Sequence, residues 1–204
     1  MDEILDILDE NYQVIGQETR KKVHEQELLH AAFQCWFYTH LNKTPYIMFQ
    51  RRNPDVNYPN LLDITAAGHL TSGEGPIEGA REIEEELGVN PAFDDLVSLG
   101  IYQDTLIRKD KKKDREVCHL YAFLYQDELE RLNLNQEEVA GIVCMTLDDF
   151  QRILQAPGEK FDVDTASYQG HEVENMTISL SIDDFVPHSR GYYKYVIEKI
   201  RELL

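Results

Sequence analysis

Basic residues are few in this 204-residue sequence, and long apolar runs are absent. Only 20 Lys and Arg side chains accompany 38 Asp and Glu, so the formal charge is −18 at pH 7. Sequence-independent nucleic-acid binding requires Lys and Arg to displace counterions, and this charge argues against it. No stretch approaches the roughly 18 to 20 apolar residues of a membrane span, and the amino-terminus is acidic where a signal peptide would be basic. We therefore predict a cytoplasmic protein that binds neither nucleic acid nor a membrane.

Cysteine is also scarce. Cys35, Cys118 and Cys144 make an odd number, lack the spacing of metal ligands, and each lies in an apolar run. The simplest interpretation is three buried, reduced thiols, which excludes a disulfide framework. By contrast, 42% hydrophobic and 10% aromatic residues provide ample material for a folded core.

The order of apolar segments predicts an α/β fold, with a mixed sheet and helices packed on it. We expect strands over 4–8, 12–15, 31–38, 46–50, 96–107, 117–125 and 139–145, and helices over 76–87, 147–154 and 191–204. We expect one domain over 1–204. It would comprise an N-terminal β-hairpin extension over about 1–28, a core over about 29–155, and a C-terminal helical appendage over about 156–204.

The helix expected over 76–87 carries a stripe of carboxylates. At about 100° per residue, Glu82, Glu85 and Glu86 fall within roughly one 100° arc, and apolar residues occupy the opposite side. Like charges one turn apart destabilise a helix, as do carboxylates in its last turn, and a bound divalent cation would reverse both effects. Oxygen ligands without His or Cys on the same face favour Mg²⁺, with Mn²⁺ as an alternative. An acidic face exposed to solvent is the competing interpretation, because the whole chain is acidic.

The residues from Gly68 to Val89 resemble the Nudix box, the signature of hydrolases that act on nucleoside diphosphates and other substituted diphosphates. The family pattern is Gly, five residues, Glu, seven residues, and then Arg-Glu-apolar-any-Glu-Glu-any-Gly-apolar. Here Gly68 and Glu74 have the first spacing, and the final segment reads REIEEELGV. Only six residues separate Glu74 from Arg81, so we expect an irregular start of the helix.

The resemblance implies a Nudix fold, in which a mixed sheet packs between α-helices, and a Mg²⁺-dependent hydrolase that uses water to attack phosphorus. Glu82, Glu85 and Glu86 would hold the metal, and the Gly68 carbonyl would complete its shell. Arg81 would pair with a carboxylate of the box.

A carboxylate must also accept the proton of the attacking water. It can belong to the helix, as Glu82 or Glu85, or to a later segment, where Glu116, Glu137 and Glu138 are candidates. Glu138 is best placed, directly before the strand expected over 139–145, although an ordinary exposed glutamate is an equally good interpretation.

His24, His30 and His69 occupy positions that resemble isopentenyl diphosphate isomerase, a relative that shares the Nudix fold and binds a metal through histidines. This second resemblance implies a second metal site. The isomerase has a catalytic cysteine where this chain has Ala67, and it lacks most of the acidic box. We therefore expect a Nudix hydrolase of the isomerase-like branch. An isomerase-like enzyme and a non-catalytic Nudix ligand sensor are the alternatives.

Arg51 and Arg52 follow the strand expected over 46–50, where this branch carries an arginine that meets the diphosphate. A guanidinium suits phosphate geometry, and a chain this acidic needs local positive charge. Protection of a strand edge is the alternative. We expect at least one of the two to bind a small-molecule diphosphate, whose identity no shared motif encodes. A homodimer is an expectation from the family alone.

Overall fold

The computed structural model describes residues 3–41, 43–108 and 110–204. The strands are β1 (Ile4–Leu8), β2 (Val14–Thr19), β3 (Leu29–Leu41), β4 (Thr44–Arg52), β5 (Leu62–Asp63), β6 (Ala66–His69), β7 (Val97–Ile107), β8 (Lys113–Leu124), β9 (Val139–Thr146), β10 (Phe161–Tyr168) and β11 (Val173–Leu180). The helices are α1 (Arg20–Glu25), α2 (Pro76–Gly79), α3 (Arg81–Leu87), α4 (Leu147–Gln155) and α5 (Arg190–Arg201). No helix in these ranges is long and apolar enough to cross a membrane.

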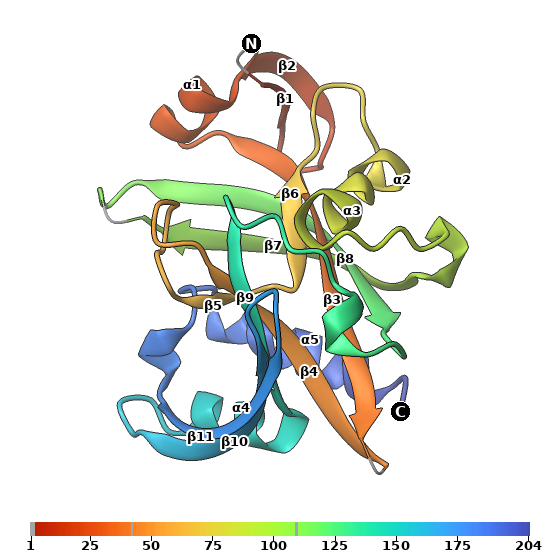
Figure 1. The fold of residues 1–204 in the computed structure, drawn as a ribbon. Helices are drawn as coiled ribbons and strands as arrows, with labels where there is room; N and C mark the ends of the chain where they lie inside the picture. Colours follow the sequence, from red (N-terminus) through yellow and green to blue (C-terminus); the bar gives the residue numbers. More distant parts are fainter. Residues whose placement is uncertain (1–2, 42, 109) are drawn as a thin grey trace.

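A large mixed sheet organises the molecule (Figure 1). Its strands follow the order β11-β10-β9-β4-β3-β8-β7, while β5 pairs with β4 and β6 pairs with β3. The long pairing of β3 with β8 is parallel, and the other pairings in this sheet are antiparallel. The predicted mixed sheet is therefore confirmed.

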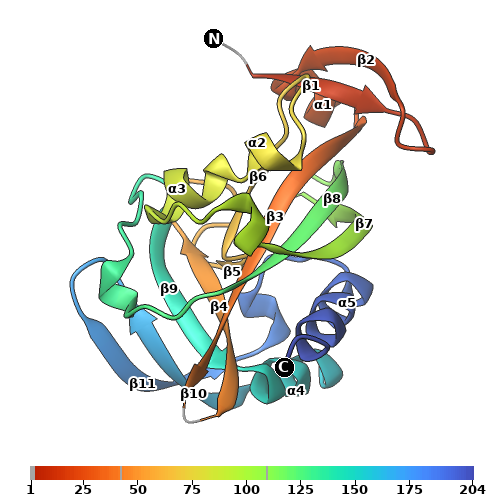
Figure 2. The ribbon, with the colours of Figure 1, turned by 90° about the vertical axis from the view of Figure 1, so that its right-hand side faces the viewer.

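Helices cover both faces of the sheet (Figure 2). Successive side chains of a strand point to opposite faces, so Trp36 and Phe37 of β3 enter different cores. Trp36 packs with Phe150 of α4 and Tyr192 of α5, whereas Phe37 shares the other core with Ile83 of α3. This arrangement confirms the predicted sheet between helices, and it places α3 on the face opposite the C-terminal helix.

The N-terminal β-hairpin extension is confirmed as a separate two-stranded sheet, in which β1 pairs with β2. It is joined to the main body through the segment after β6. Leu5 is fully buried and forms a bridge with Thr71, and the Ser72 amide donates to the Ile4 carbonyl at 2.8 Å. The hairpin thereby extends the molecule beyond one end of β3 (Figure 2).

The helix expected over 76–87 is interrupted, as the short spacing after Glu74 predicts. α2 ends at Gly79 and α3 begins at Arg81. A side chain at Gly79 would overlap Leu70 and Phe33, so only glycine allows this close approach to the sheet.

The prediction of a helical appendage over 156–204 is wrong for the first half of that segment. β10 and β11 form a hairpin there, and β10 continues the main sheet by pairing with β9. The inward positions of β10 include buried Thr165 and Ser167 beside Val163, so the apolar alternation typical of a strand is weak. β11 is an edge strand with mostly exposed residues. Only α5 and a short 3-10 turn make the remainder of this segment helical.

The three cysteines are free and buried, as predicted.

Candidate functional site

A cleft of about 330 Å³ brings together most of the residues that the sequence analysis selected. Its lining includes Arg52, Gly68, Arg81, Glu82, Glu85, Glu86 and Glu138, together with His24, His69, Asp114 and Glu116. Arg51 is not among the lining residues, and its Nη1 donates to the carbonyl of Asn60 at 3.3 Å. Adjacent residues of a strand point in opposite directions, which separates Arg51 from Arg52.

Two carboxylates of α3 are enclosed in protein. Glu86 is only 4% exposed, and its Oε2 accepts hydrogen bonds from the Ala67 amide at 3.0 Å and from the Gln50 side chain at 3.3 Å. Burial raises the pKa of Glu86 well above its ordinary value. Burial also raises the pKa of Glu82 to about 7, although the neighbouring Arg81 opposes the shift. Both groups are thus costly to ionise without a compensating cation.

The backbone at Gly68 lies directly against the Glu82 carboxylate. A Cβ atom at this position would overlap the Glu82 carboxyl group, so the sequence needs glycine here. Buried carboxylates beside a backbone carbonyl provide hard oxygen donors, and this set fits Mg²⁺. Among the described residues, the carboxylate oxygens of Glu82, Glu85 and Glu86 do not all lie within 4.8 Å of one another, which is the separation expected of atoms that share a metal ion. Sharing one ion therefore requires rotation of these side chains.

Arg81 connects the acidic residues of the motif. Its guanidinium lies 3.2 Å from Glu74 Oε2, 3.1 Å from Glu82 Oε1 and 3.5 Å from Glu85 Oε1. Glu74 also accepts the Thr71 amide at 2.8 Å. The missing residue of spacing therefore does not prevent Glu74 from reaching Arg81. Glu85 is the outermost of these acids, with 57% of its side chain exposed.

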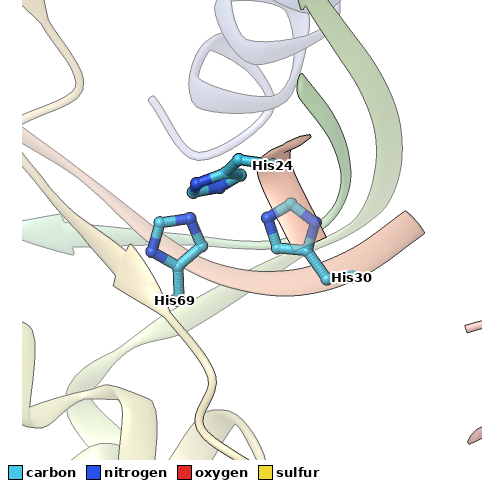
Figure 3. A group of neighbouring side chains, drawn as sticks. All are labelled: His24, His30 and His69. Atoms are coloured by element: carbon cyan, nitrogen blue, oxygen red, sulfur yellow. The ribbon is translucent and has the colours of Figure 1, made fainter. Parts of the chain in front are cut away.

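Three histidines from α1, β3 and β6 form a compact group (Figure 3). The ring centroids of His24, His30 and His69 are 5.1 Å apart in every pair. The Nε2 atom of each ring is buried and has no hydrogen-bond partner. Three unsatisfied nitrogen atoms that face a common space are what a metal-free ligand set presents.

The protonation of these rings suits a metal. Burial lowers the pKa of His24 to about 4 and also lowers the pKa values of His30 and His69. All three rings are consequently neutral at pH 7, which is the form that binds metals. His30 Nδ1 lies 3.0 Å from the Leu28 carbonyl, which can only accept, so Nδ1 carries the proton and Nε2 presents its lone pair.

Two carboxylates of β8 complete this group. Asp114 Oδ1 is buried without a hydrogen-bond partner, 3.4 Å from His24 Nε2 and 3.7 Å from His30 Nε2. Glu116 Oε1 lies 3.9 Å from His69 Nε2, and burial followed by the nearby Asp114 charge raises the pKa of Glu116 to about 8. Imidazole nitrogen with carboxylate oxygen is a donor set for a transition metal.

The sequence did not reveal Asp114 as part of this group, because it lies among lysines and arginines at the start of β8. Glu116 was expected only as a candidate base. Their position depends on the parallel pairing of β3 with β8, in which His30 is opposite Glu116. Such a long-range pairing leaves no local signal.

A second missed group lies beside Arg52. Arg52 Nη1 forms an ion pair with Asp63 Oδ2 at 2.7 Å, and Asp63 in turn contacts His188. His188 also contacts Asp104. Asp63, Asp104 and His188 come from three separate segments of the sequence, and no motif connects them.

Comparisons with known proteins agree with the motif. The family model described as NUDIX domain matches residues 28–165. An uncharacterized Nudix hydrolase of Clostridium acetobutylicum is 36% identical over 204 residues, which cover 98% of this chain and 98% of that protein.

Solved structures share the fold at low identity. The structure of DR0079 from Deinococcus radiodurans aligns with a TM-score of 0.56 at 20% identity, over 76% of this chain and 90% of the other. The NUDIX domain of Shewanella oneidensis NrtR, solved as a complex with ADP ribose, aligns with a TM-score of 0.50 at 15% identity, over 85% and 86% of the two chains.

Proposed function

The chain belongs to the Nudix hydrolase family, and we propose that it is a Mg²⁺-dependent enzyme that cleaves a diphosphate linkage by water attack at phosphorus. The substrate would be a nucleoside diphosphate derivative or another organic diphosphate, and Mn²⁺ would serve as an alternative metal. One observation carries this proposal: the buried carboxylate of Glu86 and the largely buried carboxylate of Glu82 line the same cleft as the Arg52 guanidinium. The cleft thus combines a place for cations with a donor for phosphate oxygens.

The residues of the motif would have different roles in metal binding and catalysis. Glu82, Glu85 and Glu86 would hold the metal with the Gly68 carbonyl, and a bound ion would polarise a phosphoryl oxygen and lower the pKa of water. Arg81 contacts Glu82 and Glu85, so it would keep their carboxylates oriented.

Arg52 is the proposed substrate-binding residue. Of the two predicted arginines, Arg52 lines the cleft and Arg51 does not. A guanidinium that already uses Nε and one Nη can still offer its second Nη to a phosphate oxygen.

Glu138 is the proposed general base. It lines the cleft from the position directly before β9, and its carboxylate is held by a 3.2 Å hydrogen bond from Asn135. Glu116 also lines the cleft, but its Oε1 lies 3.9 Å from His69 Nε2, within the histidine group, where it would serve as a metal ligand and not as the base.

We also propose that His24, His30 and His69, with Asp114 and Glu116, hold a transition-metal ion. This arrangement supports a place in the isomerase-like branch of the family. Ala67 stands where the isomerase has its catalytic cysteine, so hydrolysis is the favoured reaction. The predicted homodimer stays a prediction.

A panel of nucleoside diphosphate derivatives and other organic diphosphates, incubated with Mg²⁺ or Mn²⁺, tests the proposal. We expect at least one compound to release phosphate, pyrophosphate or a monophosphate. Glu86→Gln should lower the rate by roughly a hundredfold or more, since one transition-state charge partner is worth several kcal/mol. Glu84→Gln, on the exposed side of the same helix, is the matched control. Absence of turnover, or wild-type activity of Glu86→Gln, would contradict the proposal.

A further inference from the structure

His188 lies buried between two aspartates that come from different strands. Its Nδ1 is 2.9 Å from Asp104 Oδ2, and its Nε2 is 3.3 Å from Asp63 Oδ1. The three side chains are 4%, 7% and 1% exposed for His188, Asp63 and Asp104. A neutral imidazole has a single N–H and satisfies one carboxylate, whereas an imidazolium donates to both. The contacts on both ring nitrogens therefore favour the charged ring.

The charges of this group balance. Burial opposes protonation of His188, but the hydrogen bonds to Asp104 and Asp63 outweigh it and raise the pKa of His188 to about 9. Burial likewise opposes ionisation of Asp63, but His188 and Arg52 lower its pKa to about 2. Two cations and two carboxylates thus lie in contact, with His188, Asp63 and Asp104 buried and the Arg52 side chain 25% exposed in the cleft. Removal of a single member leaves an uncompensated buried charge.

Asp63 contacts both His188 and Arg52, so its orientation links the two side chains. One carboxylate oxygen, Oδ1, faces His188 and also accepts the Ile64 amide at 2.8 Å. The other oxygen, Oδ2, accepts from Arg52 Nη1 at 2.7 Å. Because both oxygens are engaged, rotation of the carboxylate would break contacts on both sides. Arg52 is fixed further by a 2.7 Å hydrogen bond from its Nε to the Asn57 carbonyl.

The C-terminal segment fixes His188 itself. Its ring stacks on Tyr192 of α5 with centroids 4.6 Å apart. Before the helix, the Val186 amide donates to the Leu62 carbonyl at 2.8 Å, which places this segment beside β5. After His188, the Ser189 amide points to the Asp104 carboxylate at 3.3 Å. The start of α5 is therefore attached directly to the strands that carry both aspartates.

We propose that His188 is a positioning residue for substrate binding: His188 holds Asp63, and Asp63 holds Arg52 in the orientation that receives the diphosphate. The C-terminal segment, which lies outside the residues of the recognised motif, would in this way set the geometry of the cleft. The inference rests on the proposed role of Arg52 in binding the substrate. His188 acts through the two side chains between it and the ligand, and no proton transfer to the substrate is involved.

A double-mutant cycle tests this chain of contacts. Binding of inorganic pyrophosphate in the presence of Mg²⁺ is measured by calorimetry for wild type, His188→Gln, Arg52→Gln and the double variant. We expect each single variant to raise the Kd by roughly tenfold or more, as loss of a charge-assisted hydrogen bond does. The double variant should bind no more weakly than Arg52→Gln alone, because both changes remove the same contact. Independent, multiplicative effects of the two changes would overturn the inference.

Two further variants separate positioning from folding. Asp104→Asn preserves the size of a side chain that does not line the cleft. We expect it to raise the Kd as well, but only in a protein that retains Arg52. Tyr195→Phe removes a 2.6 Å hydrogen bond from α5 to the Leu99 carbonyl and should lower the melting temperature without changing the Kd. An Asp104→Asn protein with wild-type Kd would also overturn the inference. If Arg52→Gln itself binds normally, the inference fails, while turnover that is sensitive to Glu86→Gln still decides the proposed function separately.

Discussion

The hydroxyl of Tyr192 on α5 donates a 2.6 Å hydrogen bond to the side-chain carbonyl of Gln34 on β3. The amide of the same Gln34 donates to Glu116 at 3.2 Å, and the indole of Trp36 donates to the Tyr192 hydroxyl at 3.1 Å. One buried chain of hydrogen bonds therefore connects the C-terminal helix to a carboxylate of the histidine group. The helix supports this group and the Arg52 side of the cleft from the same position.

The first prediction concerns this chain of hydrogen bonds. Tyr192→Phe removes the hydroxyl and leaves the Trp36 N–H and the Gln34 carbonyl buried without partners. Unsatisfied buried groups cost about 1 to 3 kcal/mol each, so we expect the free energy of unfolding to fall by roughly 2 kcal/mol or more. Urea denaturation measures this loss. A variant as stable as wild type would show that another donor or water replaces the hydroxyl.

The second prediction concerns the close packing of Gly68 against Glu82. Gly68→Ala would displace the Glu82 carboxylate, so we expect weaker Mg²⁺ binding and a loss of activity of roughly tenfold or more. Gly16→Ala is the matched control, because its added methyl group would meet only Ile7 at an ordinary 3.6 Å. Metal titration by calorimetry and steady-state kinetics compare the two variants. Equal behaviour of both would refute a specific role for the contact between Gly68 and Glu82.

The third prediction concerns metal retention by the histidine group. The purified protein should contain about one equivalent of a transition metal, since neutral imidazoles and carboxylates at this separation bind such ions. His69→Asn should lose the metal, and His171→Gln, at an exposed histidine of the β10–β11 turn, should keep it. Elemental analysis after dialysis measures the content. Equal metal in both variants would place the ion elsewhere.

Local sequence signals predicted the mixed sheet, the helices on it and the acidic residues of the motif, but not the hairpin of β10 and β11. The spacing from Gly68 to Gly88 specifies a loop, an interrupted helix and a carboxylate stripe, because all of these depend on neighbours in sequence. The short spacing after Glu74 predicted an irregular start of this helix, and the structure places the interruption between Gly79 and Arg81. Local signals could not separate Arg51 from Arg52, since only the direction of β4 decides which of the two faces the cleft.

Contacts between distant segments could not be predicted from the sequence. Asp63, Asp104 and His188 meet only because β5, β7 and the start of α5 converge, and each residue taken alone reads as an ordinary polar position. The hairpin of β10 and β11 was missed for a related reason. Its inward side chains include Thr165 and Ser167, so a pattern based on apolar residues does not reveal the strand.

The last prediction concerns the pH dependence of stability that His188 produces. A histidine whose pKa rises from 6.5 in the unfolded chain to about 9 in the folded protein stabilises the folded state. The full contribution, roughly 3 kcal/mol, is present below pH 6.5 and is lost as the pH rises through about 9. Asp63 has the opposite sign: its pKa is lowered from 3.8 to about 2, so its contribution is present above pH 3.8 and is lost on acidification. The group should therefore stabilise the protein most between about pH 4 and 6.5.

Comparison with His188→Gln isolates this effect from other groups that titrate at alkaline pH. Gln carries no charge at any pH, so the difference in unfolding free energy between wild type and variant should be largest near pH 6. It should shrink by roughly 3 kcal/mol by pH 10, because wild type then loses the imidazolium. Denaturation at a series of pH values measures the difference. A difference for His188→Gln that does not change between pH 6 and pH 10 would mean that His188 is neutral in the folded protein, which would remove the charge balance that holds Asp63 between His188 and Arg52.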